Sequence, residues 1–404
     1  MYYYFKFLQN AFVGQRKMNI NITDKNQSKH APKKSKRADD LISDIRDNCT
    51  DCSLCRKECE FLDRYVSPKM IINGKDSTNP ELLRMAYECS LCGLCGAVCP
   101  AGLQPGELFS ALREASVLSG DAPLKSFRQI LAFEKRGTSR RYSWYSLPEN
   151  CDTVFFPGCE LPGTRPTKTL DLYNHLKTLI PDIGIVLDCC CKPSRDLGRL
   201  AYFHDMLREM KSYLLSHGVR RLITACPNCH SVFSTHGKPL EVISVYEVIA
   251  RHGLPGNPAP HKRFTIHDSC VTRHDTSIQN AVRDIIETKG LSIMEMPHSR
   301  EKAICCGKGA AVSYIDPKLA NAWRNQRLKE TAGHPIITYC AGCAGAFKGK
   351  TPVFHLIDIL FEPQSAASGK PRVSRSPMTY LNRLWLKHVL RKHENSAFFR
   401  ERNY

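Results

Sequence analysis

Hydrophobic and polar positions follow two different periods along this chain, and the change of period divides it. From Leu41 to about residue 148, apolar side chains recur every three or four residues, as in PELLRMAYECSLC (80–92) and PGELFSALREASVL (105–118). That spacing predicts helices. From Thr153 onward, short apolar runs alternate with helical patterns, which predicts successive strand and helix units. We therefore expect an α plus α/β protein, with an α-helical domain first and α/β domains after it.

The α/β part contains the same series of elements twice. The first copy comprises a strand at 153–159, a helix at 169–180, a strand at 183–191, a helix at 201–218, a strand at 220–229 and a last strand at 240–249. The second comprises 262–270, a helix from about Ser277, 291–297, 303–309, a helix at 319–333, 335–343 and 351–360. A Pro- and Gly-rich linker, HGLPGNPAPHK (252–262), joins the copies. Two tandem lobes related by pseudo-twofold symmetry across a cleft are the expected arrangement.

These patterns divide the chain into five segments. They are a disordered basic arm (1–40), the helical domain (41–148), the first lobe (149–256), the second lobe (257–370) and a basic tail (371–404). The tail contains an amphipathic helix, TYLNRLWLKHVLRKH (379–393), with Leu381, Leu384, Trp385 and Val389 on one side and Arg383, Lys387 and Arg391 on the other. Two interpretations stay open: a helix that covers the protein surface, or a helix that docks on a membrane or a membrane protein.

The net charge of +19 lies mainly in the two terminal segments, which together contribute +12 of it. An almost ordinary charge balance between them argues against nucleic-acid binding and favours a protein partner or an anionic membrane face. No apolar run reaches the roughly 18 residues of a spanning helix, and no export signal is recognisable. We expect a cytoplasmic protein that reaches the inner face of the membrane through a partner.

Eighteen of the twenty cysteines fall into four groups. Adjacent cysteines have Cα atoms about 3.8 Å apart, which is less than the 4.4 Å or more that a disulfide usually requires. Cys-Cys pairs and C-x2-C groups therefore suit metal binding in a reducing compartment better than disulfides.

The first two groups, NCTDCSLCRKECE and ECSLCGLCGAVCP, each read C-x2-C-x2-C-x3-C. Three closely spaced thiolates hold three corners of a 4Fe-4S cubane, and the fourth cysteine serves the neighbouring cluster. We assign one cluster to Cys49, Cys52, Cys55 and Cys99, and the other to Cys89, Cys92, Cys95 and Cys59. Zinc is the weaker alternative. All irons of such cubanes are saturated by sulfur, so these clusters transfer electrons and the chemistry must occur elsewhere.

The other two groups each contain five cysteines, one in each lobe. The first set is Cys159, Cys189, Cys190, Cys226 and Cys229, and the second is Cys270, Cys305, Cys306, Cys340 and Cys343. Five thiolates exceed the four that zinc or an ordinary cubane takes. In both copies the cysteines follow the carboxyl ends of strands, where α/β folds place ligands.

The motifs around these cysteines resemble the cysteine-rich CCG domain. They read GCE, CCCKPSRDLG and CPNC in the first lobe, and DSC, CCGKG and CAGC in the second. A tandem CCG pair behind a two-cluster ferredoxin-like domain resembles the catalytic subunit of membrane-type heterodisulfide reductase. The iron-sulfur subunits of anaerobic glycerol-3-phosphate dehydrogenase and glycolate oxidase share this architecture. The resemblance covers roughly residues 45 to 362 and neither tail.

The resemblance implies that each five-cysteine set holds a noncubane 4Fe-4S cluster, and that a disulfide is split between the two. The ten cysteines would then be catalytic, with the ferredoxin-like clusters supplying electrons. Lys192, Lys308, His267 and His274 lie beside these cysteines in sequence and could supply protons, although each is more commonly an ordinary charge or hydrogen-bonding group.

The first set departs from the family pattern, because Cys191 occupies the place of the motif glycine. A side chain there could shift the geometry or offer a sixth thiolate, so this site could hold a noncubane cluster, a cubane or zinc, or nothing. The second set retains Gly307, and Cys151 lies outside every motif.

Three functions follow from these patterns. The first is an oxidoreductase acting on a thiol/disulfide couple as part of a complex. The second is an electron-transfer subunit between a flavin dehydrogenase and a quinone or membrane cytochrome, and the third is a zinc-stabilised scaffold. The chain has no G-x-G-x-x-G after a strand and no P-loop, so we expect no flavin or nucleotide site in it. A flavoprotein or a membrane cytochrome or quinone-reactive subunit is the expected partner.

Overall fold

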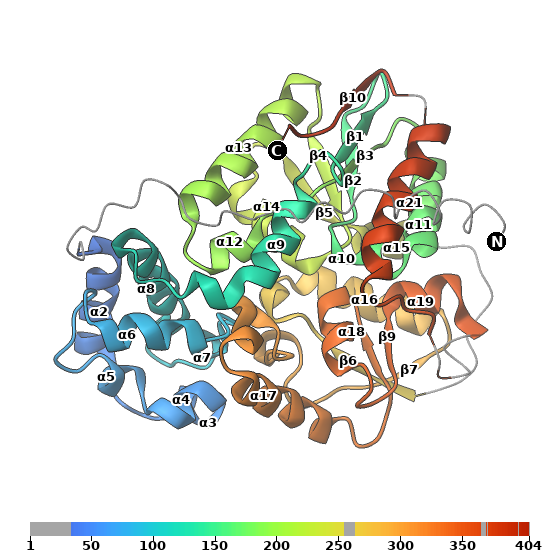
Figure 1. The fold of residues 1–404 in the computed structure, drawn as a ribbon. Helices are drawn as coiled ribbons and strands as arrows, with labels where there is room; N and C mark the ends of the chain where they lie inside the picture. The colour runs from blue at the N-terminus through green and yellow to red at the C-terminus, as the bar shows by residue number, and fades with distance from the viewer. Residues whose placement is uncertain (1–33, 254–262, 365–368, 370, 395, 404) are drawn as a thin grey trace.

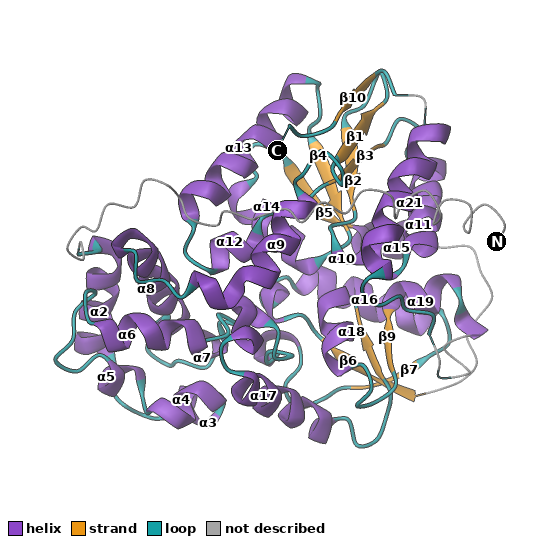
Figure 2. Cartoon of the chain, viewed as in Figure 1, coloured by secondary structure: helices purple, strands orange, loops and turns teal. Residues whose placement is uncertain are grey.

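The computed structural model describes residues 34–253, 263–364, 369, 371–394 and 396–403. It combines helices with two largely parallel sheets, as the periodicity predicts (Figures 1 and 2). A helical part lies at one end, and two α/β lobes pack against each other beside it (Figure 1). Most of the linker between the copies and residues 1–33 of the predicted disordered arm lie outside the described residues.

The helical part is built from short helices that begin at capping residues. Its first helix begins at Lys36 rather than at the predicted Leu41, because the Ser35 side chain accepts a hydrogen bond from the backbone N–H of Ala38. The longest helix ends at Gly120, which takes the left-handed conformation that favours glycine. The helices are α2 (Lys36–Asn48), α3 (Leu54–Lys57), α4 (Glu60–Tyr65), α5 (Pro68–Ile71), α6 (Pro80–Met85), η1 (Ala86–Glu88), α7 (Leu94–Ala97), α8 (Pro105–Ser119), η2 (Leu124–Phe127) and α9 (Arg128–Gly137).

The first lobe contains a sheet with the strand order β10-β1-β3-β2-β4-β5. The strands are β1 (Trp144–Leu147), β2 (Thr153–Phe156), β3 (Gly184–Leu187), β4 (Arg221–Thr224), β5 (Glu241–Ser244) and β10 (Phe398–Arg400). The helices are α10 (Glu160–Thr164), α11 (Pro166–Leu179), α12 (Lys192–Asp196), α13 (Leu200–Ser216), α14 (Pro227–His236) and α15 (Val245–His252). The four strands from the repeated pattern are mutually parallel, whereas β1 and β10 extend the sheet antiparallel at one edge. Those two strands were not predicted.

The second lobe has a four-stranded parallel sheet with the order β7-β6-β8-β9. Its strands are β6 (Arg263–His267), β7 (Ser292–Met294), β8 (Ile336–Thr338) and β9 (Val353–His355). Its helices are η3 (Cys270–Thr272), α16 (Thr276–Thr288), η4 (Arg300–Lys302), η5 (Gly309–Tyr314), α17 (Pro317–Glu330), α18 (Ala341–Phe347) and α19 (Leu356–Phe361). In both lobes the four strands of the copy lie side by side in the order second, first, third, fourth: β3-β2-β4-β5 in the first lobe and β7-β6-β8-β9 in the second. The two copies therefore share one topology.

The predicted last strand of each copy is wrong in the same way. Only Glu241–Ser244 and Val353–His355 are strands, and the apolar residues after them form α15 and α19. The side chains of Ser244 and His355 each accept a backbone N–H at the helix start, and Glu247 and Asp358 complete the capping boxes. A capping box starts a helix within an apolar run that periodicity alone reads as a strand. The predicted segment 303–309 likewise contains no strand.

The basic tail folds back onto the first lobe. Helix α21 (Met378–His393) packs against α10 and α11, and β10 pairs with β1 (Figure 1). Its basic residues Arg383 and Lys387 are buried, with the Lys387 ammonium donating to the carbonyls of Arg140 and Ser143 at 2.7 and 2.9 Å. The helix therefore covers the protein surface with part of its predicted basic side inward.

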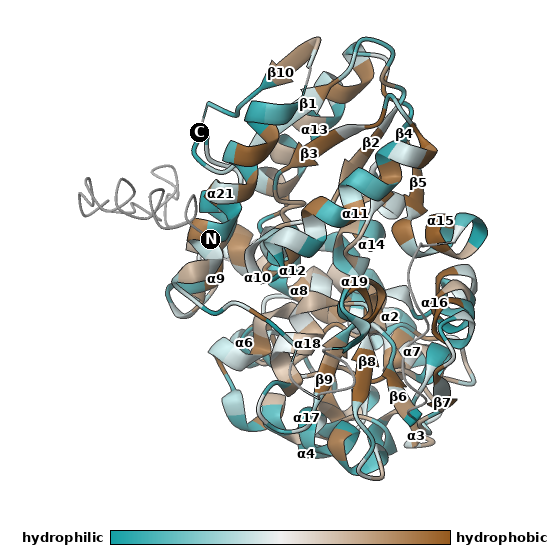
Figure 3. Ribbon diagram, turned by 90° about the vertical axis from the view of Figure 1, so that its right-hand side faces the viewer, coloured by the Kyte–Doolittle hydropathy of each residue, from teal (hydrophilic) through white to brown (hydrophobic). Residues whose placement is uncertain are grey.

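One hydrophobic core is continuous between the lobes. Phe155 and Tyr246 of the first lobe and Phe264 and Tyr339 of the second belong to the same buried cluster. Figure 3 shows strands of both sheets as hydrophobic interior elements, with the polar residues on the outer helices. Burial on this scale fixes the lobes against each other. Among the described residues, no helix combines the length and apolar character that crossing a bilayer requires.

Candidate metal centres

The two ferredoxin-like cysteine groups adopt matching local conformations. In each, a residue in the left-handed region, Ser53 (φ 61°) or Gly93 (φ 77°), turns the chain between the second and third cysteines into a short helix. This turn lets three thiols of one group face a common centre. Both groups surround the helical core, in which Phe61, Leu108 and Phe109 are buried.

The neighbours of each thiol follow the exchanged pairing. Burial and the nearby Cys49, Cys99 and Cys52 raise the pKa of Cys55 to about 11. Burial, and then Cys92 and Cys89, raise the pKa of Cys59. The pKa of Cys95 is raised by burial and by Cys89, Cys92 and Cys59. The fold thus brings the thiols within each of the two predicted cubane sets close to one another.

In the first lobe all five cysteines of the first set converge at the carboxyl ends of β2, β3 and β4. Hydrogen bonds link the thiols of Cys159 and Cys189, and burial adds to the rise in the pKa of Cys159. The Cys190 thiol contacts those of Cys189 and Cys229, which lower its pKa. The Cys229 thiol in turn contacts Cys226. Gly158 before the first of these cysteines leaves room for them, because a Cβ there would lie 3.2 Å from the Cys229 sulfur.

Cys191, which replaces the motif glycine, adopts the left-handed conformation that the glycine would supply (φ 54°). Its side chain turns toward Glu134 of α9 and Cys189, and the three ligand atoms lie within 4.8 Å of one another. Hydrogen bonding to Cys189 and burial raise the pKa of Cys191 well above its ordinary value. Burial raises the pKa of Glu134 to about 7, although Ser194 donates to its carboxylate. A sixth thiol therefore adjoins the first set.

The second set assembles in the same way in the second lobe. The Cys305 thiol contacts those of Cys270 and Cys306, and its sulfur accepts the N–H groups of Gly307 and Gly309 at 3.2 Å each. Gly307 is required here, because a Cβ would lie 2.2 Å from the carbonyl oxygen of Ala320 and φ is 87°. The Cys343 thiol contacts those of Cys306 and Cys340.

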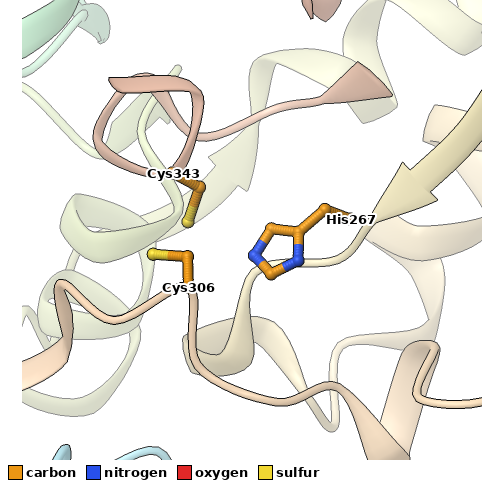
Figure 4. A group of neighbouring side chains, drawn as sticks. All are labelled: His267, Cys306 and Cys343. Carbon is orange, nitrogen blue, oxygen red and sulfur yellow. The ribbon is translucent and has the colours of Figure 1, made fainter. Parts of the chain in front are cut away.

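Of the four predicted proton donors, two reach the second set. His267 is 1% exposed and lies beside Cys306 and Cys343, with its ring pointing at them in Figure 4. Burial lowers the pKa of Lys308, but Glu160 and the second-set thiols Cys306, Cys343 and Cys340 outweigh it and raise the pKa. In contrast, Lys192 pairs with Asp196, and His274 is exposed.

The two five-cysteine sets adjoin at the boundary between the lobes. The side-chain amide of Asn228, between Cys226 and Cys229, lies 3.8 Å from the Cys340 sulfur. The Tyr246 hydroxyl donates to the carbonyls of Ala225 at 3.3 Å and Tyr339 at 3.1 Å, each of which precedes the first cysteine of a C-x2-C. Lys308 of the second lobe faces Glu160 of the first.

The second set also adjoins the ferredoxin-like domain. Cys270 lies near Cys92, and Cys89 lies near Cys305. Arg273 of the second lobe donates to the Cys92 carbonyl at 3.0 Å. The spatial order is therefore the Cys49 group, the Cys89 group, the second set and then the first set.

Sequence reasoning missed Arg113 of α8, which is completely buried where the domains meet. Its guanidinium donates to the carbonyls of Ala86 (3.0 Å) and Cys89 (2.6 Å) in its own domain. It also donates to Asp196 (2.8 Å) of the first lobe and Ala310 (3.2 Å) of the second. The signal that could have identified it is helical spacing: Arg113 follows Phe109 by four residues and so lies on the buried face of α8.

Arg383 of α21 was also missed as a site residue. It is 6% exposed, lies over the rings of Phe133 and Tyr142, and lowers the pKa of Cys159 by its charge against the larger effects that raise it. Its Nη1 atom has no hydrogen-bond partner in the described structure. The C-terminal tail thus brings a cation to the first set, which no local pattern near those cysteines could indicate.

His298 connects the ferredoxin-like domain to the second lobe by hydrogen-bonding to Glu58 at 2.6 Å and to Glu330. Hydrogen bonding to Glu330 raises the pKa of His298 against the opposing effect of burial, and Glu58 raises it further. A raised folded pKa stabilises this contact below the ordinary pKa of 6.5, and the contribution is lost as the pH rises through the folded value.

We therefore expect protection of α4 and α17 amides from hydrogen exchange to fall more in the wild type than in His298→Asn as the pH rises above the ordinary pKa of 6.5. Comparing the two proteins at each pH removes the intrinsic pH dependence of exchange. Equal declines in both would show that His298 does not hold the domains together through its charge.

The donor sets fit metal clusters chemically. No disulfide joins any of the twenty cysteines, and burial raises the pKa of Cys55, Cys89 and Cys95. Several convergent buried thiols stay protonated unless metal cations compensate their charge, so metal binding would release these protons. Iron-sulfur clusters take such all-thiolate sets.

Comparison with known proteins agrees with this arrangement. Residues 45–103 match the 4Fe-4S dicluster domain, and residues 153–234 and 264–348 match the cysteine-rich domain CCG. The chain is 24% identical to a heterodisulfide reductase subunit of Methanosarcina barkeri, over 70% of this chain and 78% of the relative. It is 23% identical to the corresponding Methanosarcina mazei protein, over 70% and 83%, and 23% identical to an uncharacterized iron-sulfur protein of Methanococcus maripaludis, over 76% and 68%.

The two Methanosarcina relatives are described as subunits of a dihydromethanophenazine:CoB--CoM heterodisulfide reductase. The matched domains cover all eighteen cysteines of the four groups. The chain is therefore an iron-sulfur oxidoreductase that is similar to heterodisulfide reductase subunits, with a 4Fe-4S dicluster domain followed by two CCG domains.

Proposed function

We propose that this protein reduces or forms a disulfide at the boundary between its two CCG domains. The observation that carries the proposal is the adjacency of two five-thiol sets, shown by Asn228 reaching from the first C-x2-C to Cys340 of the second. A disulfide that enters between the sets could present one sulfur to each. Its reduction consumes two electrons and two protons and releases two thiols.

The proposal assigns four metal groups to the chain. Two 4Fe-4S cubanes would be held by Cys49, Cys52, Cys55 and Cys99, and by Cys89, Cys92, Cys95 and Cys59. The two five-cysteine sets would hold noncubane 4Fe-4S clusters. When bound, these groups supply electrons and sulfur-binding iron. The matching strand orders and five-cysteine patterns support an approximate twofold relation between the two sites.

Lys308 is placed to deliver a proton to a released thiolate. Its ammonium is surrounded by groups of both lobes, since Glu160 follows Cys159 of the first set and the nearby thiols belong to the second. The raised pKa keeps this group charged near neutral pH, so it could both stabilise a thiolate and protonate it.

A cavity of about 550 Å³ gives access to the same region. Glu160 and Ala341, which directly follow Cys159 and Cys340, both line it, and α21 contributes Tyr380. The volume suits a small organic ligand. Lys348 and Arg375 add positive charge to its wall, so a substrate carrying an acidic group would be favoured.

A partner protein has to supply or accept the electrons. We propose a flavoprotein or a membrane cytochrome or quinone-reactive subunit, with this chain at the inner face of the membrane through that partner. Cys52 is the exposed member of the Cys49 group, so this end of the molecule suits electron entry. Any membrane contact of the chain itself would involve surfaces other than the buried Arg383 and Lys387 of α21.

Iron, sulfide and zinc analysis of protein purified without oxygen tests the proposal. Four 4Fe-4S clusters predict about 16 iron atoms per chain. Oxidation in the presence of different thiols should then produce a thiol-dependent paramagnetic resonance signal. About eight iron atoms together with zinc would contradict the noncubane clusters, and full iron without a thiol-dependent signal would favour an electron-relay protein.

A further inference from the structure

His267 places an unpartnered polar atom at the second five-cysteine set. Its side chain is 1% exposed, and a ring nitrogen and the sulfurs of Cys306 and Cys343 lie within 4.8 Å of one another. The Nε2 atom has no hydrogen-bond partner in the described structure. Figure 4 shows the ring aimed at the two cysteines from the end of β6. A buried nitrogen without a partner is costly unless something occupies the space it faces.

The other ring nitrogen decides what Nε2 can do. Arg327 donates its Nε–H to Nδ1 of His267 at 3.3 Å, and an arginine has only donors to offer. Nδ1 is therefore the acceptor, so the proton of the neutral ring is on Nε2. Arg327 itself is held by Glu330 and by the carbonyl of Ile266 at 3.5 Å. A protonated Nε2 is a hydrogen-bond donor and not a metal ligand.

The first lobe lacks this donor at the equivalent position. Phe156 ends β2 and His267 ends β6, each three residues before the first cysteine of its set. Phe156 pairs with Thr224 in the same register in which His267 pairs with Thr338. Both rings also make an edge contact with a phenylalanine, Phe233 at 5.0 Å and Phe347 at 4.9 Å between centroids. The two sites thus share a ring in the same place, but only the second ring has an N–H.

We propose that His267 donates a hydrogen bond from Nε2 to the sulfur atoms of the second site, at Cys306 and Cys343. This hydrogen bond makes the metal group there easier to reduce than the one in the first site. The inference rests on the proposed function, because it needs a redox-active group at the second set. Hydrogen bonds to cluster sulfurs stabilise the added negative charge of the reduced state. Because the second set also adjoins Cys92 and Cys89, electrons arriving from the cubanes would be retained at this site first.

Redox titrations followed by paramagnetic resonance test this positioning role in anaerobically purified full-length protein. His267→Phe reproduces the ring of the first lobe and should disfavour reduction of the second site by about tenfold, which corresponds to about 59 mV for one electron. His267→Gln keeps an N–H donor and should lose less. Cys306→Ser identifies the second-site signal, and the first-site signal in the same sample should not move.

His355→Asn is the matched control. His355 pairs with Thr338 from the opposite side and is equally buried, while its Nδ1 caps α19 by accepting the Ile357 N–H. Asparagine retains capping ability, so this variant should leave both potentials unchanged. If the second-site potential in His267→Phe equals that of the wild type, the hydrogen bond is refuted.

A wild-type measurement covers the case in which His267→Phe does not fold. Protein labelled with ¹⁵N-histidine should show a nitrogen coupling on the second-site signal, and the absence of that coupling would overturn the inference. A wild type that binds only about eight iron atoms would instead refute the proposed function and this inference together. The two failures are therefore distinguishable by iron content.

Discussion

Replacing Cys306 with serine is expected to remove the proposed noncubane cluster of the second site, with a loss of about four iron atoms per chain and of all the proposed disulfide turnover above background. Cys306 is 4% exposed and its thiol contacts those of Cys305 and Cys343. A serine hydroxyl does not ionise as a thiol does and binds iron weakly, so this corner of the site would be lost. The disulfide would then meet a metal group on one side only.

Cys151→Ser is the control for this substitution. Cys151 is also buried, at 3% exposed, but its thiol donates to the Thr153 carbonyl at 3.2 Å and lies outside the four groups. A serine hydroxyl can make the same hydrogen bond, so iron content and turnover should stay at wild-type levels. The measurements are iron and sulfide per chain and the rate of disulfide reduction with an artificial electron donor. Full turnover in Cys306→Ser would contradict catalysis between the two sets.

Arg113→Met is expected to loosen the junction of all three domains and to lower the free energy of unfolding by at least about 3 kcal/mol. Methionine fills much of the same space but offers no donor to the four carbonyls that Arg113 now satisfies. Each unsatisfied buried carbonyl costs roughly 1–3 kcal/mol, although neighbouring losses do not add fully. The contact of the guanidinium with the Tyr87 ring, 5.0 Å from its centroid, is lost as well.

Arg37→Met is the control, which tests whether the loss of any arginine that interacts at α8 lowers the free energy of unfolding as much. Arg37 contacts Glu107 of the same helix at 2.6 Å, but its side chain is 49% exposed. Exposed ion pairs contribute roughly 0–1 kcal/mol, so this variant should unfold almost as the wild type does. The measurements are anaerobic thermal unfolding and the rate of proteolysis between the domains. Similar small effects in both variants would show that Arg113 does not hold the junction.

Hydrophobic periodicity predicted the longest helices and the strands of the repeat because their signals are local, whereas most of the short helices were not predicted. The errors come from residues whose effect depends on hydrogen bonding. Ser244 and His355 end the last strands early by capping a helix, and Ser35 starts α2 before Leu41 in the same way. Strands β1 and β10 join the sheet through pairing with segments distant in sequence, so neither segment alone carries a strong signal.

The sequence by itself determined the inventory of thiols, their division into four groups and the duplication of the lobes. These depend on residue type and spacing along the chain, and spacing is enough to set which cysteines a single loop can turn toward one centre. Only the tertiary structure decided that the two five-cysteine sets adjoin, that Arg113 joins three domains, and that His267 faces thiols where Phe156 occupies the matching position. These relations join residues that are far apart in sequence, and only the folding of each lobe and the packing of the lobes against each other and against the helical domain bring their atoms close together.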